Sequence, residues 1–273
     1  MRKLALCLLA AALISLPILG TGCTKLQARD HLNKGVNAFK NAQYPEAVEH
    51  FKQAVALDPT YTNARLYLGT AYMQQYIPGS INPENQQMAD AAEGSFKDVL
   101  KEDPKNETAI AYLASLYLNQ KRWDDANAWY DKLTTVNPKS AVGFYSKGFI
   151  AWSEWYPADG TARANLGMKI EDPGPIKDKK VREELKAKYS AIIQDGLNNL
   201  DKALAVDPDY DDAMAYENLL FRERADLADN KDDYEAQVKI ANDWIDKAMA
   251  VKKKKIEAKQ KVGSGGIVAE PAK

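Results

Sequence analysis

The chain has 273 residues, of which 45% are hydrophobic and 9% aromatic, and its formal net charge is −1. This composition supplies enough apolar side chains for one or two packed domains and excludes a disordered chain. The near-neutral charge gives no reason to expect nucleic acid as a partner, because binding to phosphates requires an excess of basic residues.

A signal peptide is predicted over residues 1–22. Arg2 and Lys3 form its positive start, and an uncharged apolar run follows from Leu4 to Leu19. The run is short for a membrane span, and its flanks are those of a secretory signal. Removal of the segment takes the net charge from −1 to −3, because two positive charges and no negative ones are lost.

Three small residues stand immediately before Cys23. This arrangement resembles the bacterial lipobox, although Gly20 occupies the position where that pattern has an aliphatic residue. The resemblance implies that Cys23 is the first mature residue and carries a lipid anchor, with residues 23–27 as a linker of about 15 Å if extended. Thr24, in place of an aspartate, favours the outer membrane. The alternative is ordinary secretion, with Cys23 left as a free thiol.

Two series of residues recur along the rest of the chain with one base period. Prolines that follow Asp or Asn are spaced by 45, 34 and 70 residues, and a second series is spaced by 34, 45, 34 and 70. The longer spacings place insertions in the second and fourth units. The first series is Pro59, Pro104, Pro138 and Pro208, and the second is Gly35, Gly69, Ala114, Gly148 and Asn218.

This period and these marks resemble the tetratricopeptide repeat (TPR), a helix-turn-helix unit of about 34 residues. The third unit carries the family's characteristic residues without an insertion, among them Leu113, Ala114, Tyr117, Trp123, Ala126, Tyr130, Leu133 and Pro138. The resemblance implies an all-α TPR solenoid, a right-handed superhelix of about five repeats with insertions in the second and fourth. Stacked neighbours supply its core, because one repeat cannot bury its apolar face alone.

The predicted solenoid covers residues 28–251, with a charged fifth repeat that serves as a cap. Residues 252–273 are expected to form a basic helix end and a disordered tail, since a glycine-rich stretch begins after Val262. The five repeats are expected at about 28–61, 62–106, 107–140, 141–210 and 211–251.

The two insertions are the individual features of this chain. The smaller, 76–87, is predicted to be a loop because it contains prolines and glycine. The larger, 154–189, is predicted to be a loop through Pro175 and then a helix with Asp178 as its N-cap. Its apolar and aromatic residues predict that the loop folds back on the solenoid.

In the TPR family the first helix of each repeat lines a concave groove, and the resemblance implies an apolar, aromatic lining here. An exposed apolar groove marks a binding surface, and the alternative is that the large insertion fills it. Leu32 and Val36 stand where the family's carboxylate-binding lysine and asparagine would be, so capture of a C-terminal carboxylate is not expected. The predicted partner-binding residues are Phe39, Leu66, Met73, Leu118, Tyr145, Phe149, Trp152 and Arg222.

These features predict a non-enzymatic protein-interaction scaffold or adaptor with proteins or peptides as partners. The lipobox resemblance places it at the bacterial cell envelope, in envelope assembly or secretion, anchored at Cys23 and facing the periplasm. No nucleophile, phosphate-loop or metal-ligand motif accompanies the two histidines, so no catalytic residue, cofactor or metal site is predicted. The acidic run 207–212 lacks the glycine and distal glutamate of a calcium loop, and is interpreted as an inter-repeat turn.

A second class of function uses the same aromatic residues differently. A glycan- or small-ligand-binding lipoprotein would need aromatic rings with polar neighbours in a closed pocket, whereas a peptide site needs an open channel. A purely structural spacer is a third interpretation and predicts no ligand. The stacking residues of the glycan hypothesis are Tyr145, Trp152, Trp155 and Tyr156.

Overall fold

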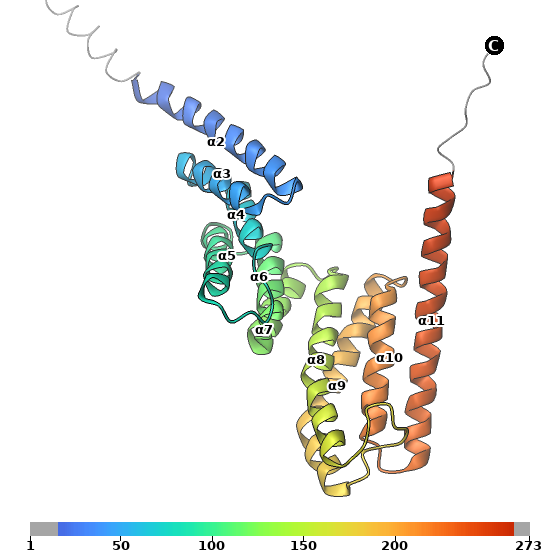
Figure 1. Ribbon diagram of the computed structural model, residues 1–273. Helices are drawn as coiled ribbons and strands as arrows, with labels where there is room; N and C mark the ends of the chain where they lie inside the picture. Colours follow the sequence, from blue (N-terminus) through green and yellow to red (C-terminus); the bar gives the residue numbers. More distant parts are fainter. Residues whose placement is uncertain (1–15, 265–273) are drawn as a thin grey trace, which may run out of the picture. The chain divides into compact units, whose positions relative to one another are not determined.

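The computed structural model describes the backbone of residues 16–264 and the side chains of residues 23–260. These residues form ten helices and no strand, which confirms the predicted all-α class (Figure 1). None of these helices is long and apolar enough to cross a membrane. In chain order they are α2 (Leu16–Lys40), α3 (Tyr44–Leu57), α4 (Thr62–Met73), α5 (Pro83–Glu102), α6 (Glu107–Asn119), α7 (Trp123–Val136), α8 (Ala141–Asn165), α9 (Lys179–Val206), α10 (Asp211–Asp226) and α11 (Lys231–Ser264).

The chain forms two compact units that divide within α7, after Trp129. In the first unit, α2 packs on α3, α3 on α4, α4 on α5 and α5 on α6. In the second unit, α8 packs on α9, and α10 contacts α8, α9 and α11. Antiparallel helix pairs that pack on their neighbours are the arrangement of a TPR solenoid.

A small residue allows the two helices of a repeat to approach closely. A Cβ atom on Gly35 would lie 2.5 Å from Cε1 of Phe51, so only glycine fits at this crossing. The Phe51 ring then stacks on Tyr67 of the next repeat, with ring centroids 5.4 Å apart. The same arrangement recurs one repeat later with Gly69, Phe96 and Tyr112.

The Asp-Pro and Asn-Pro marks form the turns between repeats. Asp58 accepts a hydrogen bond from the backbone N–H of Thr60 through Oδ1, at 3.1 Å, and from that of Tyr61 through its carbonyl, at 3.0 Å. A side chain that satisfies the backbone two residues on stabilises such a turn. The same pair of bonds recurs at Asp103, Asn137 and Asp207.

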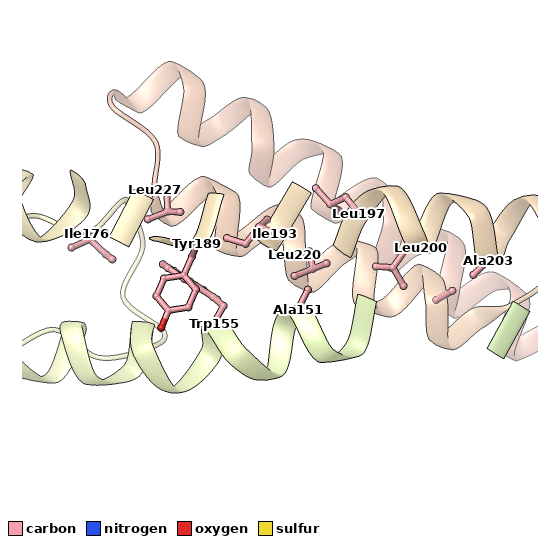
Figure 2. Packing of buried hydrophobic residues seen from close by; sticks show 11 residues of the cluster. Ala151, Trp155, Ile176, Tyr189, Ile193, Leu197, Leu200, Ala203, Leu220 and Leu227 are labelled. Carbon is pink, nitrogen blue, oxygen red and sulfur yellow. The ribbon is translucent and has the colours of Figure 1, made fainter. Parts of the chain in front are cut away.

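The core of the second unit lies between α8, α9 and α10 (Figure 2). Trp155 on α8 is fully buried, and its ring meets Tyr189 of α9 edge-on with centroids 5.2 Å apart. Aromatic pairs prefer this geometry. The other buried members of this core are Ala151, Ile176, Ile193, Leu197, Leu200, Ala203, Ala213, Leu220 and Leu227.

The large insertion is helical for longer than predicted, and the loop expected from Glu154 is wrong. Helix α8 continues through Asn165 even though it contains Pro157. Trp155, Asp159 and Arg163 follow one another at intervals of four residues and are all buried. Burial of this helix face offsets the cost of an internal proline, which is about 3 kcal/mol.

The rest of the insertion folds back on the second unit, as predicted. The loop between α8 and α9 buries Ile176, whose N–H donates to the carbonyl of Asp226 at 3.0 Å. Asp178 caps α9 by accepting from the N–H of Val181 at 2.9 Å, which confirms the predicted N-cap. The second helix of this repeat is therefore extended to 28 residues.

The smaller insertion is a shorter loop than predicted, because α5 already begins at Pro83. The buried side chain of Asn85 holds this loop closed. It accepts from the N–H of Ile77 at 2.7 Å and donates to the carbonyls of Ile77 and Ser80 at 2.9 and 3.0 Å. Ile77 and Ile81 remain exposed on the loop.

Both ends of the predicted solenoid need correction. Helix α2 begins at Leu16, so residues 23–27 are helical and span about 8 Å along the axis instead of forming an extended linker. Helix α11 continues past Val251, as the predicted basic helix end implies, but it reaches Ser264 and so includes the start of the glycine-rich stretch after Val262. Cys23 is exposed. Residues 1–15 of the predicted signal peptide and residues 265–273 of the predicted tail lie outside the described residues.

Candidate functional site: an aromatic face and an acidic pocket

The predicted groove residues of the first unit lie in different settings. Phe39 packs against the core around Phe51 and meets Tyr44 edge-on, with centroids 5.3 Å apart. Leu66 lines a hollow of about 260 Å³ together with residues of α4 and α6. Met73 and Leu118 are half-buried.

Helices α8 and α10 of the second unit, with the residue that precedes α10, carry a connected set of aromatic side chains, which we call the aromatic face. Phe149 and Trp152 both meet the ring of Tyr216, with centroids 5.3 and 5.6 Å away. Trp152 also stacks on Tyr156 at 4.8 Å. The rings of Tyr145 and Tyr210 lie 5.0 Å apart. The aromatic face consists of Tyr145, Phe149, Trp152, Tyr156, Tyr210 and Tyr216.

Most of the aromatic face is half-buried, so part of each ring is open to solvent. Tyr145, Phe149 and Trp152 share one side of α8, as their spacing predicts, since all three contact the ring of Tyr216. Phe149 is not among the side chains that pack against the core beneath it. Burial raises the pKa of Tyr145 and Tyr216, and that of Tyr210 to about 12, so these hydroxyl groups stay neutral at physiological pH.

One end of the aromatic face borders a cavity of about 360 Å³, which we call the acidic pocket. Its wall is formed by α8, α10, the N-terminal part of α11 and the loop residues 170–173. The residues that give the pocket its chemistry are Trp152, Tyr156, Asp159, Arg222, Glu223 and Asp226.

A buried arginine sits beside the carboxyl groups of this pocket. Arg163 is 1% exposed, and its Nε donates to both carboxylate oxygens of Asp159 at 3.0 Å. Its Nη2 lies 2.5 Å from Oδ1 of Asp226. Glu223 accepts the indole N–H of Trp155 through Oε2. Arg222 is exposed and donates to Asn242 at 2.7 Å instead.

Burial disfavours the charged form of all three carboxyl groups. Burial raises the pKa of Glu223 to about 8, although the hydrogen bond from the Trp155 N–H lowers it. It raises the pKa of Asp226 to about 7, although Arg163 lowers it, and it also raises the pKa of Asp159. Carboxyl groups with strongly raised pKa values in a cavity are typical of functional sites.

The sequence analysis missed this carboxyl cluster. Asp159 lies in the segment predicted to be a loop, whereas Glu223 and Asp226 lie more than 60 residues further along the chain. Trp155, Asp159 and Arg163 are spaced by four residues, and this helical spacing is the sequence signal that could have indicated a helix through Pro157.

The loop of the large insertion lies at the end of the aromatic face formed by Trp152 and Tyr156. Its loop residues 170–173 line the same cavity as Trp152 and Tyr156. The ring contacts of Tyr145 and Phe149 are with Tyr210, Tyr216 and Trp152. Trp155 is fully buried, so it offers no stacking surface, contrary to the glycan hypothesis.

Comparison with known families identifies the repeats. Residues 85–143 match a family model described as "Tetratricopeptide repeat", and residues 39–75 match one described as "TPR repeat". No curated protein sequence matches the chain. With the helix pairs described above, these matches show TPR repeats over residues 39–75 and 85–143 in an all-α fold of the TPR solenoid type.

Solved structures share this fold. The structure described as "Crystal structure of MamA protein" is 13% identical, has a TM-score of 0.54, and covers 90% of this chain and 98% of that chain. "MamA 41-end from Desulfovibrio magneticus RS-1" is 14% identical, has a TM-score of 0.55, and covers 84% of this chain and 96% of that chain. At this level of identity the likeness concerns the fold alone.

Proposed function

We propose that this TPR protein is a non-enzymatic interaction scaffold and that the aromatic face of the second unit is its docking surface for a peptide segment of a partner protein. One observation carries the proposal. Aromatic rings from α8 and α10 form a continuous, partly exposed surface, and the loop of the large insertion lies at its Trp152–Tyr156 end. Aromatic side chains are enriched at the energetic centres of protein interfaces.

Two phenylalanines on α8 offer a matched test. Phe149 belongs to the aromatic face, whereas Phe144 packs against the core and lies near Lys202 of α9. Phe149→Ala is expected to reduce recovery of the partner about tenfold or more from the native cell, because truncation of a central aromatic anchor costs about 2 kcal/mol. Quantitative co-purification measures this recovery.

Phe144→Ala is the control, since it removes the same side chain from the same helix. It is expected to lower the melting temperature but to retain the partner. Equal partner recovery from the two variants would contradict the role of the aromatic face.

The proposed location is the bacterial cell envelope, with Cys23 as the lipid anchor. The apolar run from Leu4 to Leu19 and the small residues before Cys23 support it. Cys23→Ser is expected to move the protein from the membrane fraction to the soluble fraction. Several acyl chains on Cys23 would anchor the protein stably, and the serine variant cannot carry them. Cell fractionation with intact-mass analysis checks this. An unchanged distribution, or a wild-type mass without lipid, would refute the anchor.

The acidic pocket adjoins the aromatic face and could hold a small ligand. Trp152 and Tyr156 keep the polar neighbours that the glycan hypothesis requires, but they stack on each other and Trp155 is buried. The charge of this pocket indicates a different kind of ligand group.

A further inference from the structure

The acidic pocket contains more buried negative groups than positive ones. Asp159, Glu223 and Asp226 are buried or nearly so, and Arg163 is the one buried cation paired with them among the described residues. When all three carboxyl groups are ionised, they and Arg163 together carry a net charge of −2, next to the exposed Arg222 on the same pocket wall. Buried charges are costly unless a partner neutralises them.

Glu223 leaves an acceptor available in this cluster. The side chain is 7% exposed, and it uses Oε2 for the indole N–H of Trp155. Its other oxygen makes no hydrogen bond of normal geometry to a described residue, and the neighbouring Trp152 indole lowers the pKa of the carboxyl group. A carboxylate in such a position binds a cationic donor more strongly than a neutral one.

Trp152 adds an independent observation on the same wall. Its Nε1 is buried and makes no hydrogen bond of normal geometry to a described residue, although an indole N–H normally finds an acceptor when buried. The Trp152 indole lies close enough to Glu223 to lower the pKa of that carboxyl group. The Trp152 ring stacks on the exposed ring of Tyr156. The pocket thus offers an indole donor without a hydrogen bond of normal geometry, an aromatic wall, and three carboxyl groups beside one buried guanidinium.

We propose that the acidic pocket binds the ammonium or guanidinium group of a lysine or arginine side chain on the peptide that docks on the aromatic face. A peptide meets both needs of the pocket, because its cationic side chain pairs with the carboxylates while its backbone carbonyl accepts the Trp152 N–H. Aromatic rings beside the cation add a cation–π contribution. This inference rests on the proposed function and names the chemistry of the partner.

A metal ion fits the pocket less well. The ligand oxygens of Asp159, Glu223 and Asp226 lie within 4.8 Å of one another, but the Arg163 guanidinium already binds two of these carboxylates. A divalent ion there would have to displace the Arg163 guanidinium from two of its three carboxylate ligands. It would also leave the Trp152 N–H without an acceptor and most of the cavity of about 360 Å³ unfilled.

Nuclear magnetic resonance of the tryptophan indole N–H groups tests the proposal on the ¹⁵N-labelled full chain. The probes are N-acetyl-lysine amide and the matched uncharged N-acetyl-norleucine amide. The lysine probe is expected to shift the Trp152 and Trp155 indole signals saturably, whereas the norleucine probe leaves them unchanged. Equal shifts from both probes, or saturable shifts from zinc, calcium or glucose with none from the lysine probe, would overturn it.

Two variants locate the binding. Glu223→Gln keeps the acceptor for Trp155 but removes the negative charge, and is expected to weaken binding of the lysine probe about tenfold or more. Tyr156→Ala removes a side chain that is 38% exposed, so it leaves the fold intact and is expected to weaken binding as well. Unchanged affinity in both variants would rule out this pocket as the site.

The pH dependence provides a further readout. Binding is expected to strengthen from pH 6 to pH 8.5, because Asp226 and Glu223 ionise over this range. Affinity that falls over this range would contradict the proposal. The other charged or titratable groups that face the pocket are Asp159, Arg163, Glu171, Asp172, Arg222 and Tyr234.

Two more probes distinguish a cationic side chain on a peptide from a free amine. A five-residue acetylated peptide with a central lysine and flanking leucines is expected to bind about tenfold more tightly than butylamine and to shift the Phe149 ring signals too. Equal affinity would assign the pocket to free amines and overturn its link to the partner. The proposed function would then still stand on its own test, because Phe149 does not line the acidic pocket.

Discussion

Glu217 on α10 is buried away from both the aromatic face and the acidic pocket. It is 1% exposed, and its Oε1 has no hydrogen-bond partner within the described part of the chain. Burial raises its pKa to about 8 from an ordinary value of 4.5, and Asp201 adds to the effect. The folded state therefore retains a proton that the unfolded state has already lost at intermediate pH.

We expect the buried Glu217 carboxyl group to make the folded protein less stable as the pH rises. Because the folded pKa is raised, the stabilising contribution is full below about pH 4.5 and is lost as the pH rises through 8, at up to about 1.4 kcal/mol per pH unit. Glu217→Gln stays neutral, so its melting temperature is expected to match the wild type near pH 4.5 and to exceed it at pH 8.5.

Glu235→Gln is the control, because Glu235 is an exposed side chain on α11. Thermal unfolding at the two pH values makes the comparison. A Glu217→Gln curve that runs parallel to the wild type across this range would show that the group is not buried as a neutral acid.

At the scale of helices, glycine positions decide how closely pairs approach. A Cβ on Gly148 of α8 would lie 2.5 Å from Cδ2 of Leu200 on α9, whereas one on Gly94 of α5 would meet nothing within 4 Å. Gly148→Val is expected to destabilise the second unit by about 1–3 kcal/mol through overpacking. Gly94→Ala is expected to stabilise by up to about 1 kcal/mol, because alanine favours the helix.

Urea unfolding followed by circular dichroism measures both changes. Similar stabilities for the two variants would mean that α8 and α9 do not cross at Gly148.

The helix pairs follow from the repeat marks because each mark has a local physical role. Gly35 allows close packing and Asp58 forms a turn, and both roles depend on residues nearby in the sequence. The helix from Glu154 to Asn165 could not be predicted in this way. Pro157 and Gly160 indicate a loop locally, and only burial against α9 and α10 makes the helix favourable.

The candidate site is also only partly predictable from local sequence patterns. The shared side of Tyr145, Phe149 and Trp152 follows from helical spacing alone. Their contact with Tyr216 and the meeting of Asp159 with Glu223 depend on the packing of α8 against α10, which no local pattern encodes.

At the scale of the whole molecule, the TPR fold supplies partly exposed helix faces, and the individual residues decide what binds there. In this chain the second unit combines the aromatic face, the acidic pocket and the folded-back insertion. That concentration is the reason to expect the partner at α8 and α10.

Site-specific photo-crosslinking in the native cell tests this central claim most directly. A photoreactive residue at Phe149 is expected to give a discrete adduct with one other protein, and the same residue at the exposed Ala205 of α9 is expected to give none. Adducts from Phe149 that join only residues 166–178 of the same chain would show that the insertion covers the aromatic face, and would contradict its role as the docking surface.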